Sequence, residues 1–399
     1  MGILKLLFIF TILLFTFGEV IRVPVALLSI KLIDIGIVVL ASYWVLFSIK
    51  NLKKVKISKK LGVPILIFFA IALLSLLLNS RFLNINGLFV SSLYLVRWIA
   101  YASIFFIIPI FNSSFKKKIK NLLVFAGFLI VVLGYIQYFL YPNLRNLYYL
   151  GWDEHLYRLF SVFLDPNFAG AFFVLYFLFV LNILIDSFKK QARFFSLFFG
   201  IISFLTLIAI YLTYSRSALL MLITGSFVFL LLHTRKSFSI SIVIIFLLIT
   251  LLLPKVNKTE GTNFFRIASS EARLGSAKQS IEIFRQNPIF GVGFNAYRYA
   301  KSRYGFRPSM LEESHADAGT DNSFLFLLAT TGIVGFTAYL YMWFKILKIN
   351  IRSKLLIASV SALFVDSLFI NSLFYSFLMF WMWTLVGFLP AGRQVRENK

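Results

Sequence analysis

Polar residues that could do chemistry accumulate in residues 255–335, while most of the chain is apolar. The first 66 of these residues, which end at Thr320, hold ten Lys or Arg, six Asp or Glu and one of the three histidines. The guanidinium group of arginine donates hydrogen bonds in a planar fork that matches the oxygens of a phosphate. A histidine or a carboxylate can take a proton from a hydroxyl group as a general base. This composition indicates a site for an anionic substrate with a base nearby.

Two residues in this region are candidates for the base, and the sequence does not choose between them. His315 stands among the carboxylates of Glu312, Glu313 and Asp317, whereas Asp321 opens an apolar run. The alternative for His315 is an incidental histidine in a solvated acidic loop. No second histidine lies within metal-ligand spacing, and the chain has no cysteine, so we expect neither a bound metal nor another cofactor.

The composition places the protein in a membrane. Of its 399 residues, 60% are hydrophobic, 18% are aromatic and only 14% are charged. No folded surface could hide that much apolar area from water. The formal net charge of +25 would suggest a nucleic-acid partner in a soluble protein, but here topology and anionic lipid headgroups explain it first. We therefore expect membrane lipids as partners and no nucleic acid.

Apolar runs predict an all-α, multi-pass membrane protein with about twelve transmembrane helices, judged against roughly 20 residues for one crossing of the bilayer. The expected spans are residues 3–17, 23–49, 61–78, 88–111, 119–141, 166–185, 194–213, 215–232, 238–253, 322–344, 355–370 and 373–389. The first run lacks a small-x-small cleavage site, so we expect a retained anchor. The chain then divides into an N-terminal bundle (1–254), an extracytoplasmic loop (255–320) and C-terminal transmembrane helices with a short tail (321–399).

Charged residues in the short loops predict the orientation of the helices. Every even-numbered span is followed by a cluster of Lys or Arg, such as Lys116, Lys117, Lys118 and Lys120 after the fourth, while the odd-numbered exits carry few. Cytoplasmic loops are enriched in Lys and Arg. Both termini are therefore expected in the cytoplasm, and residues 255–320 are expected on the outer side of the membrane.

Three helices that would start on the outer side carry polar triplets at their N-termini. These triplets are Asp165-Pro166-Asn167, Ser215-Arg216-Ser217 and Thr320-Asp321-Asn322. Unpaired N–H groups and the helix dipole attract anions to such termini, and a lipid-linked phosphate or diphosphate is the natural candidate. The arginines expected to bind it are Arg158, Arg216, Arg266 and Arg273. In a simpler interpretation, Asp165 and Asp321 only cap their helices and Arg216 snorkels to the membrane surface.

The outer segment is expected to contain an amphipathic helix over residues 271–285. Its apolar stripe consists of Leu274, Ala277, Ile281 and Phe284, which recur at steps of three and four. Such a stripe would lie on the membrane surface. Asn287-Pro288 should end the helix. The Gly291-Val292-Gly293 turn that follows is weak evidence for a phosphate loop, because it does not follow a strand.

Charged residues inside the expected spans have two interpretations. Lys31 and Asp34 lie three residues apart on one face of the second span and are expected to neutralise each other. Arg97 lies well inside the fourth span, where an ionisable residue is a functional candidate unless it snorkels to one face of the membrane.

The order and spacing of these motifs resemble the O-antigen ligase and polymerase superfamily of bacterial surface-glycan assembly. The segments that carry the resemblance are Arg158-Leu159-Phe160-Ser161, Asp165-Pro166-Asn167-Phe168-Ala169-Gly170, Tyr214-Ser215-Arg216-Ser217-Ala218-Leu219-Leu220, Arg273, Asn287-Pro288-Ile289-Phe290-Gly291-Val292-Gly293, Asp321-Asn322-Ser323-Phe324-Leu325 and Gly332-Ile333-Val334-Gly335. They cover residues 158–335 in order.

The resemblance implies a GT-C-like glycosyltransferase that transfers an undecaprenyl-diphosphate-linked oligosaccharide to a glycan or lipid acceptor, outside the cytoplasmic membrane of a bacterium. In that family Arg216 and Arg273 would bind the diphosphate. The supporting residues would be Asn167, Asn322, Gly291 and Gly293. Ligases of the family carry a histidine where this chain has Asp321, which favours a polymerase or another branch. The alternatives are transfer to a protein, or a transporter, although transporters tend to show internal repeats.

Overall fold

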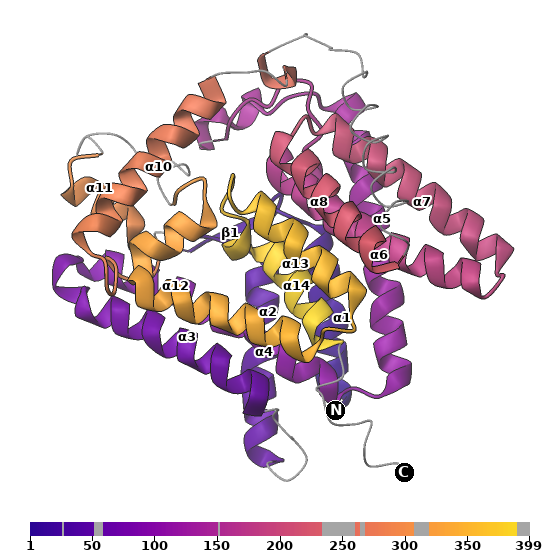
Figure 1. Ribbon diagram of the computed structural model, residues 1–399, viewed down its shortest axis with the longest axis horizontal. Helices are drawn as coiled ribbons and strands as arrows, with labels where there is room; N and C mark the ends of the chain where they lie inside the picture. The colour runs from indigo at the N-terminus through magenta and orange to yellow at the C-terminus, as the bar shows by residue number, and fades with distance from the viewer. Residues whose placement is uncertain are drawn as a thin grey trace.

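The computed structural model describes residues 1–25, 28–51, 59–150, 152–233, 260–263, 268–306 and 319–388. These residues form a bundle of helices with one two-stranded hairpin (Figure 1). The helices are α1 (Gly2–Thr16), α2 (Leu32–Lys50), α3 (Lys59–Leu78), α4 (Ile85–Ile107), α5 (Ser113–Leu140), α6 (Pro166–Lys189), α7 (Arg193–Leu212), α8 (Arg216–His233), α10 (Ala268–Gln286), α11 (Tyr297–Arg303), α12 (Ser323–Ile349), α13 (Lys354–Asp366) and α14 (Ser376–Gly387).

The predicted multi-pass helical membrane protein is confirmed in its general form. Among the described residues, eight helices are long and apolar enough to cross a membrane, namely α2 to α8 and α12. The apolar helices α1 and α14 are shorter. The expected span over residues 238–253 lies outside the described residues.

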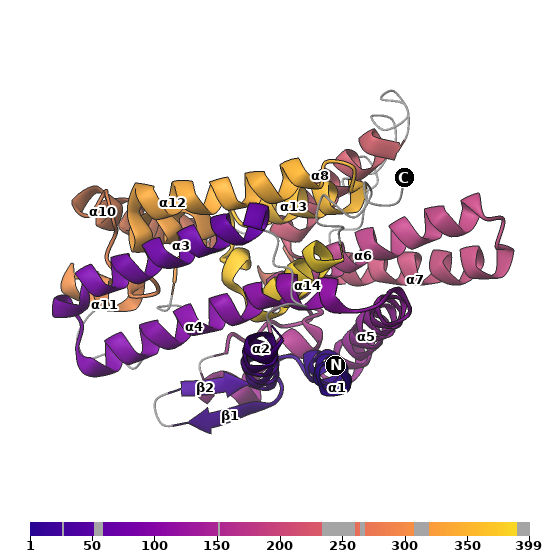
Figure 2. The ribbon, with the colours of Figure 1, turned by 90° about the horizontal axis from the view of Figure 1, so that it is seen from below.

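The helices form two groups on either side of a central helix. On one side α3 runs beside α4 and α12, and on the other α6 packs against α7 and α8 (Figures 1 and 2). Between them lies α14, whose twelve residues are all buried. Its Trp381 is surrounded by aromatic rings of α1 and α6, with ring centroids 5.3 to 6.3 Å away. Close packing of this kind, rather than a water-driven hydrophobic effect, holds helices together in lipid.

The second expected span was wrong at its start. Strand β1 (Arg22–Val25) pairs antiparallel with strand β2 (Leu28–Lys31) as a two-stranded hairpin, and α2 begins only at Leu32. Pro24 contributes to this, because proline lacks the N–H group that a helix interior requires.

A buried carboxylate holds the hairpin in place. Glu19 Oε1 lies 2.6 Å from Lys31 Nζ, and Glu19 Oε2 lies 2.8 Å from Arg22 Nη2. Burial by itself would raise the pKa of Glu19, but Lys31 and Arg22 outweigh it, so the pKa falls below its ordinary value. The expected pairing of Lys31 with Asp34 was therefore wrong, because Lys31 ends a strand and does not share a helical face with Asp34.

Asp34 is instead neutralised by helix α4. Its Oδ1 atom accepts a hydrogen bond of 2.7 Å from the Tyr101 hydroxyl, and its Oδ2 atom lies 3.7 Å from Arg97 Nη1. Arg97 also donates a hydrogen bond of 3.1 Å to the backbone carbonyl of Phe374. Arg97 is thus a partly buried link between α4, α2 and the chain before α14, and it does not snorkel.

The turn that follows α10 packs against a break in α12. Gly332 has φ 64° and ψ −170°, so the helix is interrupted there. Val292 N donates to Ala329 O at 2.9 Å, and Ile333 N donates to Pro288 O at 2.8 Å. A Cβ atom at Gly332 would lie 2.2 Å from Ile289 O, and one at Gly291 would lie 2.4 Å from the Thr330 carbonyl carbon. The two glycine motifs therefore form one joint, which fixes α10 against α12.

The predicted helix over residues 271–285 is confirmed as α10, but its predicted apolar stripe is not its buried face. Leu274 and Ile281 are exposed, at 59% and 37% of their side-chain surface. Among the described side chains of α10, the buried ones are Ser280 and Ile283, and the helix packs against α11 and α12. Small hydroxyl residues let α10 pack closely here, so steric fit decided its orientation rather than apolar periodicity.

Candidate functional site

The N-termini of α6, α8 and α12 meet the end of α13. Helix α10 packs against α12 and reaches the start of α8 through a hydrogen bond (Figure 1). Asp165 caps α6 by accepting a hydrogen bond of 2.6 Å from Asn167 N, and Pro166 occupies the first helical position. This agrees with the simpler interpretation of Asp165 as a cap. Asn167 Oδ1 in turn accepts a hydrogen bond of 3.0 Å from Ser215 Oγ, so the start of α6 is tied to the start of α8.

Arg158 is buried beneath this cluster, and backbone oxygens accept hydrogen bonds from its guanidinium group. Its Nε atom donates to Thr213 O at 2.9 Å, and its Nη2 atom lies 3.5 Å from both Tyr214 O and Asn167 Oδ1. Only 5% of the residue is exposed. Arg158 is therefore placed to position the connection between α7 and α8, and Asn167 shares that role.

Arg216 on α8 and Arg273 on α10 lie close enough to interact electrostatically. Arg216 is the first residue of α8, and its Nη2 atom donates a hydrogen bond of 3.1 Å to Ser270 Oγ on α10. Arg273 lies one turn further along α10, close enough to interact electrostatically with Arg216. Two guanidinium groups beside each other repel, and an anion between them would relieve that repulsion.

Asp321 is free of the capping role that the simpler interpretation gave it. Asn322 caps α12 instead, since its Oδ1 atom accepts hydrogen bonds of 2.9 Å from both Phe324 N and Leu325 N. Asp321 keeps access to solvent, while partial burial raises the pKa of its carboxyl and Arg273 acts in the opposite direction. A carboxylate beside an arginine at the mouth of the site can accept a proton from an incoming hydroxyl.

Hydroxyl groups of α10 hold the chain before α12. Ser276 Oγ lies 3.0 Å from Thr320 Oγ1 and 3.4 Å from Asp321 N. One turn further along α10, Ser280 Oγ lies 2.7 Å from the hydroxyl of Tyr297. The position of Asp321 relative to Arg273 is thus set by the docking of α10.

Asp366 is a site residue that the sequence reasoning missed. It ends α13 and is fully buried, and it accepts a short hydrogen bond from Ser372 Oγ. Ser217 lies beside the same carboxyl, yet Asp366 Oδ1 has no hydrogen bond of normal geometry within the described part of the chain. Arg273 also interacts electrostatically with Asp366. The available signal was an ionisable residue inside an apolar run, which is costly in a membrane.

The remaining predicted site residues divide into two groups. Gly291 and Gly293 lie at the break of α12, about three turns from Asp321, so they position α10 and do not face the arginines. His315 and Arg266 lie outside the described residues. Within the described ranges, no three His, Asp or Glu side chains come together as metal ligands.

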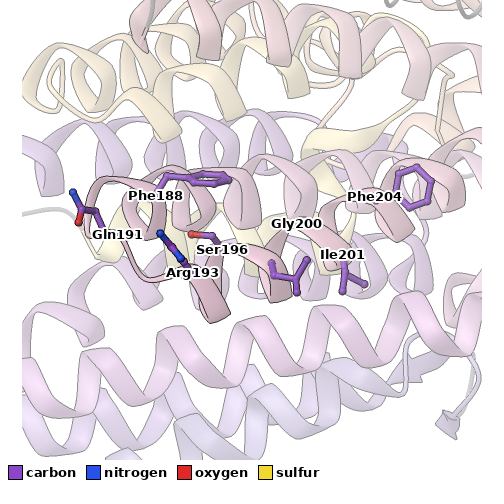
Figure 3. A pocket seen from close by; sticks show the side chains of 8 residues that line it. Phe188, Gln191, Arg193, Ser196, Gly200, Ile201 and Phe204 are labelled. Carbon is purple, nitrogen blue, oxygen red and sulfur yellow. The ribbon is translucent and has the colours of Figure 1, made fainter.

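One cavity of the described residues lies away from this site. It is an open groove of about 560 Å3 along α7, between Phe188 and Phe204, and it contains one charged side chain, Arg193 (Figure 3). Phe194 and Phe198 near its start are exposed, as expected of a surface that faces lipid. The polar groups converge at the helix N-termini and not in this groove.

Comparison with known proteins gives one finding. Residues 201–340 match the family model described as O-antigen ligase. The matched region runs from α7 through most of α12, so it contains Arg216, Arg273 and Asp321. The search of curated proteins finds no match. The family match over residues 201–340 and the membrane-length helices together support the resemblance to the O-antigen ligase/polymerase superfamily.

Proposed function

We propose that the protein transfers an undecaprenyl-diphosphate-linked oligosaccharide to a glycan or lipid acceptor, as a polymerase or ligase of surface polysaccharide. The observation that carries the proposal is the pairing of Arg216 and Arg273 beside the N-terminus of α8, within the region that matches the O-antigen ligase family. Two arginines and a helix dipole form a cradle for a diphosphate.

The proposed reaction is a single displacement at the anomeric carbon. The bond from this carbon to the diphosphate oxygen breaks, and both electrons leave with the diphosphate. The acceptor oxygen forms the new bond from the opposite face, so the configuration inverts, and its proton passes to the base. Arg216 and Arg273 stabilise the charge that develops on the leaving diphosphate, an effect worth about 3 to 4 kcal/mol for one well-placed donor. A diphosphate is a good leaving group, so the step requires neither an acid nor a metal.

Asp321 is the proposed base, and His315 is the alternative. Asp321 combines access to solvent with electrostatic contact to Arg273, so an acceptor hydroxyl can reach it beside the donor diphosphate. Asp366 is buried behind Ser217 and Ser372, and we assign it the role of orienting the start of α8.

The proposed orientation follows the lysine and arginine distribution. Both termini lie in the cytoplasm, about twelve helices cross the bacterial cytoplasmic membrane, and the site opens on the outer side. The alternation of helix directions supports this, because the starts of α6, α8 and α12 and the end of α13 share one end of the bundle.

The test is turnover by purified protein in lipid vesicles with a mixed pool of undecaprenyl-diphosphate oligosaccharides. We expect longer lipid-linked chains and released undecaprenyl diphosphate if the protein is a polymerase. Release that requires a separate lipid or protein acceptor would identify a ligase or a protein glycosyltransferase. The variant Arg216→Ala should lose product by about 100-fold or more. Arg145→Ala is the matched control, since Arg145 is exposed and paired with Glu154. Normal turnover by Arg216→Ala would contradict the proposed site.

A further inference from the structure

A cleft between four helices lies at the other end of the bundle. Its walls come from the start of α5, the second half of α6, the start of α13 and the end of α14, and its volume is about 320 Å3. Asn182 of this cleft lies 16 residues along α6 from Pro166, which corresponds to about 24 Å at a rise of 1.5 Å per residue. The cleft is therefore separate from the arginine site.

We propose that this cleft is a binding site for an anionic phospholipid. The phosphate of the headgroup lies against Lys116, Lys117 and Lys120, and an acyl chain follows the apolar wall made by α13 and α14.

The charge of the cleft favours an anion. Lys116, Lys117 and Lys120 lie on the first two turns of α5 and all line the cleft. Within the described residues, no carboxylate lies within ion-pair distance of these three lysines. Asp186 and Lys190 both interact electrostatically with Lys120 and oppose each other, so the positive charge remains. The N-termini of α5 and α13 also point their positive dipole ends here.

The other walls distinguish a phospholipid from a small anion. Phe179, Leu356 and Leu385 are buried apolar residues that line the cleft. Asn182 and Ser353 supply polar groups near the lysines, where glycerol and ester oxygens of a lipid would lie. Basic pockets between transmembrane helices bind anionic headgroups in this way. Free phosphate would leave the apolar wall without a partner.

The larger groove along α7 is less suited to this ligand. It presents Arg193 alone and is lined by one helix and its preceding turn (Figure 3). The cleft with three lysines therefore predicts selectivity for a negative headgroup, whereas the α7 groove predicts general contact with acyl chains.

Native mass spectrometry of the purified full-length protein tests the proposal. Phosphatidylglycerol and phosphatidylcholine with identical acyl chains are added in turn, and the bound fraction is followed with concentration. We expect phosphatidylglycerol to bind more tightly, and the variant Lys116→Gln/Lys120→Gln to bind it about 30-fold more weakly, because each of the two lysines near an anionic lipid contributes about 1 kcal/mol.

The matched control is Lys50→Gln/Lys118→Gln, which removes the same charge from exposed lysines that do not line the cleft. It should bind phosphatidylglycerol as the unaltered protein does. A second variant, Leu355→Trp, fills the cleft without changing its charge and should also weaken binding. Equal binding by the two double variants would overturn the proposal. Full displacement of the lipid by an equal concentration of inorganic phosphate would likewise contradict it. These readouts do not depend on glycosyl transfer, so failure of the proposed reaction leaves them intact.

Discussion

Asp321 and Asn322 are adjacent in sequence, but their side chains reach different groups and therefore have different roles. Asn322 turns back onto the first N–H groups of α12 and satisfies them. Asp321, one residue earlier, is left with access to solvent and with Arg273 as its electrostatic partner. The capping requirement of the helix is met without a carboxylate, so Asp321 is available for chemistry.

This division predicts the pH dependence of turnover. Only ionised Asp321 can accept a proton, and partial burial raises its pKa. Turnover should therefore fall as the pH is lowered, at a pH above the ordinary aspartate pKa of about 4. Asp321→Asn should lower kcat/KM by about 100-fold or more and remove this acid limb. The measurement is kcat/KM for glycan transfer across pH, with the exposed Asp153→Asn as control. An unchanged acid limb in Asp321→Asn would assign the base to another residue.

At the scale of elements, a single joint decides where α10 lies. The turn after α10 pairs with the break in α12, and Ser75 of α3 lies 2.8 Å from Thr330 O at the same place. Asn79, directly after the end of α3, donates a hydrogen bond of 3.0 Å to Gly291 O. These hydrogen bonds hold together three elements that are far apart in the chain. As a consequence, Arg273 lies near Arg216.

Substitution in this joint should weaken both the fold and the site. Gly332→Ala requires a left-handed backbone and a Cβ atom 2.2 Å from Ile289 O, so we expect a loss of about 1 to 3 kcal/mol of stability. Thermal unfolding in detergent measures this, and turnover should fall with it because α10 shifts.

Gly275, a helical glycine with free space around it, provides a control for this substitution. No atom lies within 4 Å of a Cβ built at Gly275 in α10. Gly275→Ala should keep or slightly raise stability, by about 0.5 to 1 kcal/mol, since alanine favours a helix. If Gly332→Ala behaves as Gly275→Ala does, the proposed joint is not rigid.

At the scale of the whole molecule, the two ends of the bundle carry different charged groups. One end carries the arginine site and the acidic groups Asp165, Asp321 and Asp366, while the other carries the lysines at the start of α5. The two ends therefore serve different proposed ligands, a lipid-linked diphosphate and a phospholipid headgroup.

Chemical labelling tests which end faces outward. The chain has no cysteine, so single substitutions report without background. Gly275→Cys should react with a membrane-impermeant maleimide in intact spheroplasts, whereas Lys118→Cys should react only after permeabilisation, because Lys-rich ends stay in the cytoplasm. Both positions are exposed in the structure. The opposite labelling pattern would reverse the proposed orientation and place the site in the cytoplasm.

The sequence by itself determined the properties that depend on local composition. Hydropathy over about 20 residues predicts a multi-pass helical protein, and the step of three and four predicts α10 as a helix. The order of motifs around Arg216, Arg273 and Asp321 indicated the superfamily. These features could be read from the chain because each depends on residues close together in sequence.

Only the tertiary structure decided which side chains meet. Asp366 reaches Ser217 from about 150 residues away, and the buried face of α10 follows serines rather than Leu274 and Ile281. Likewise, Asp34 accepts a hydrogen bond from Tyr101 instead of pairing with Lys31. In a membrane, apolar patterning does not separate a helix face that packs from one that meets lipid, since both are apolar. Steric fit and the pairing of buried polar groups choose the partners, and both depend on contacts between distant parts of the chain.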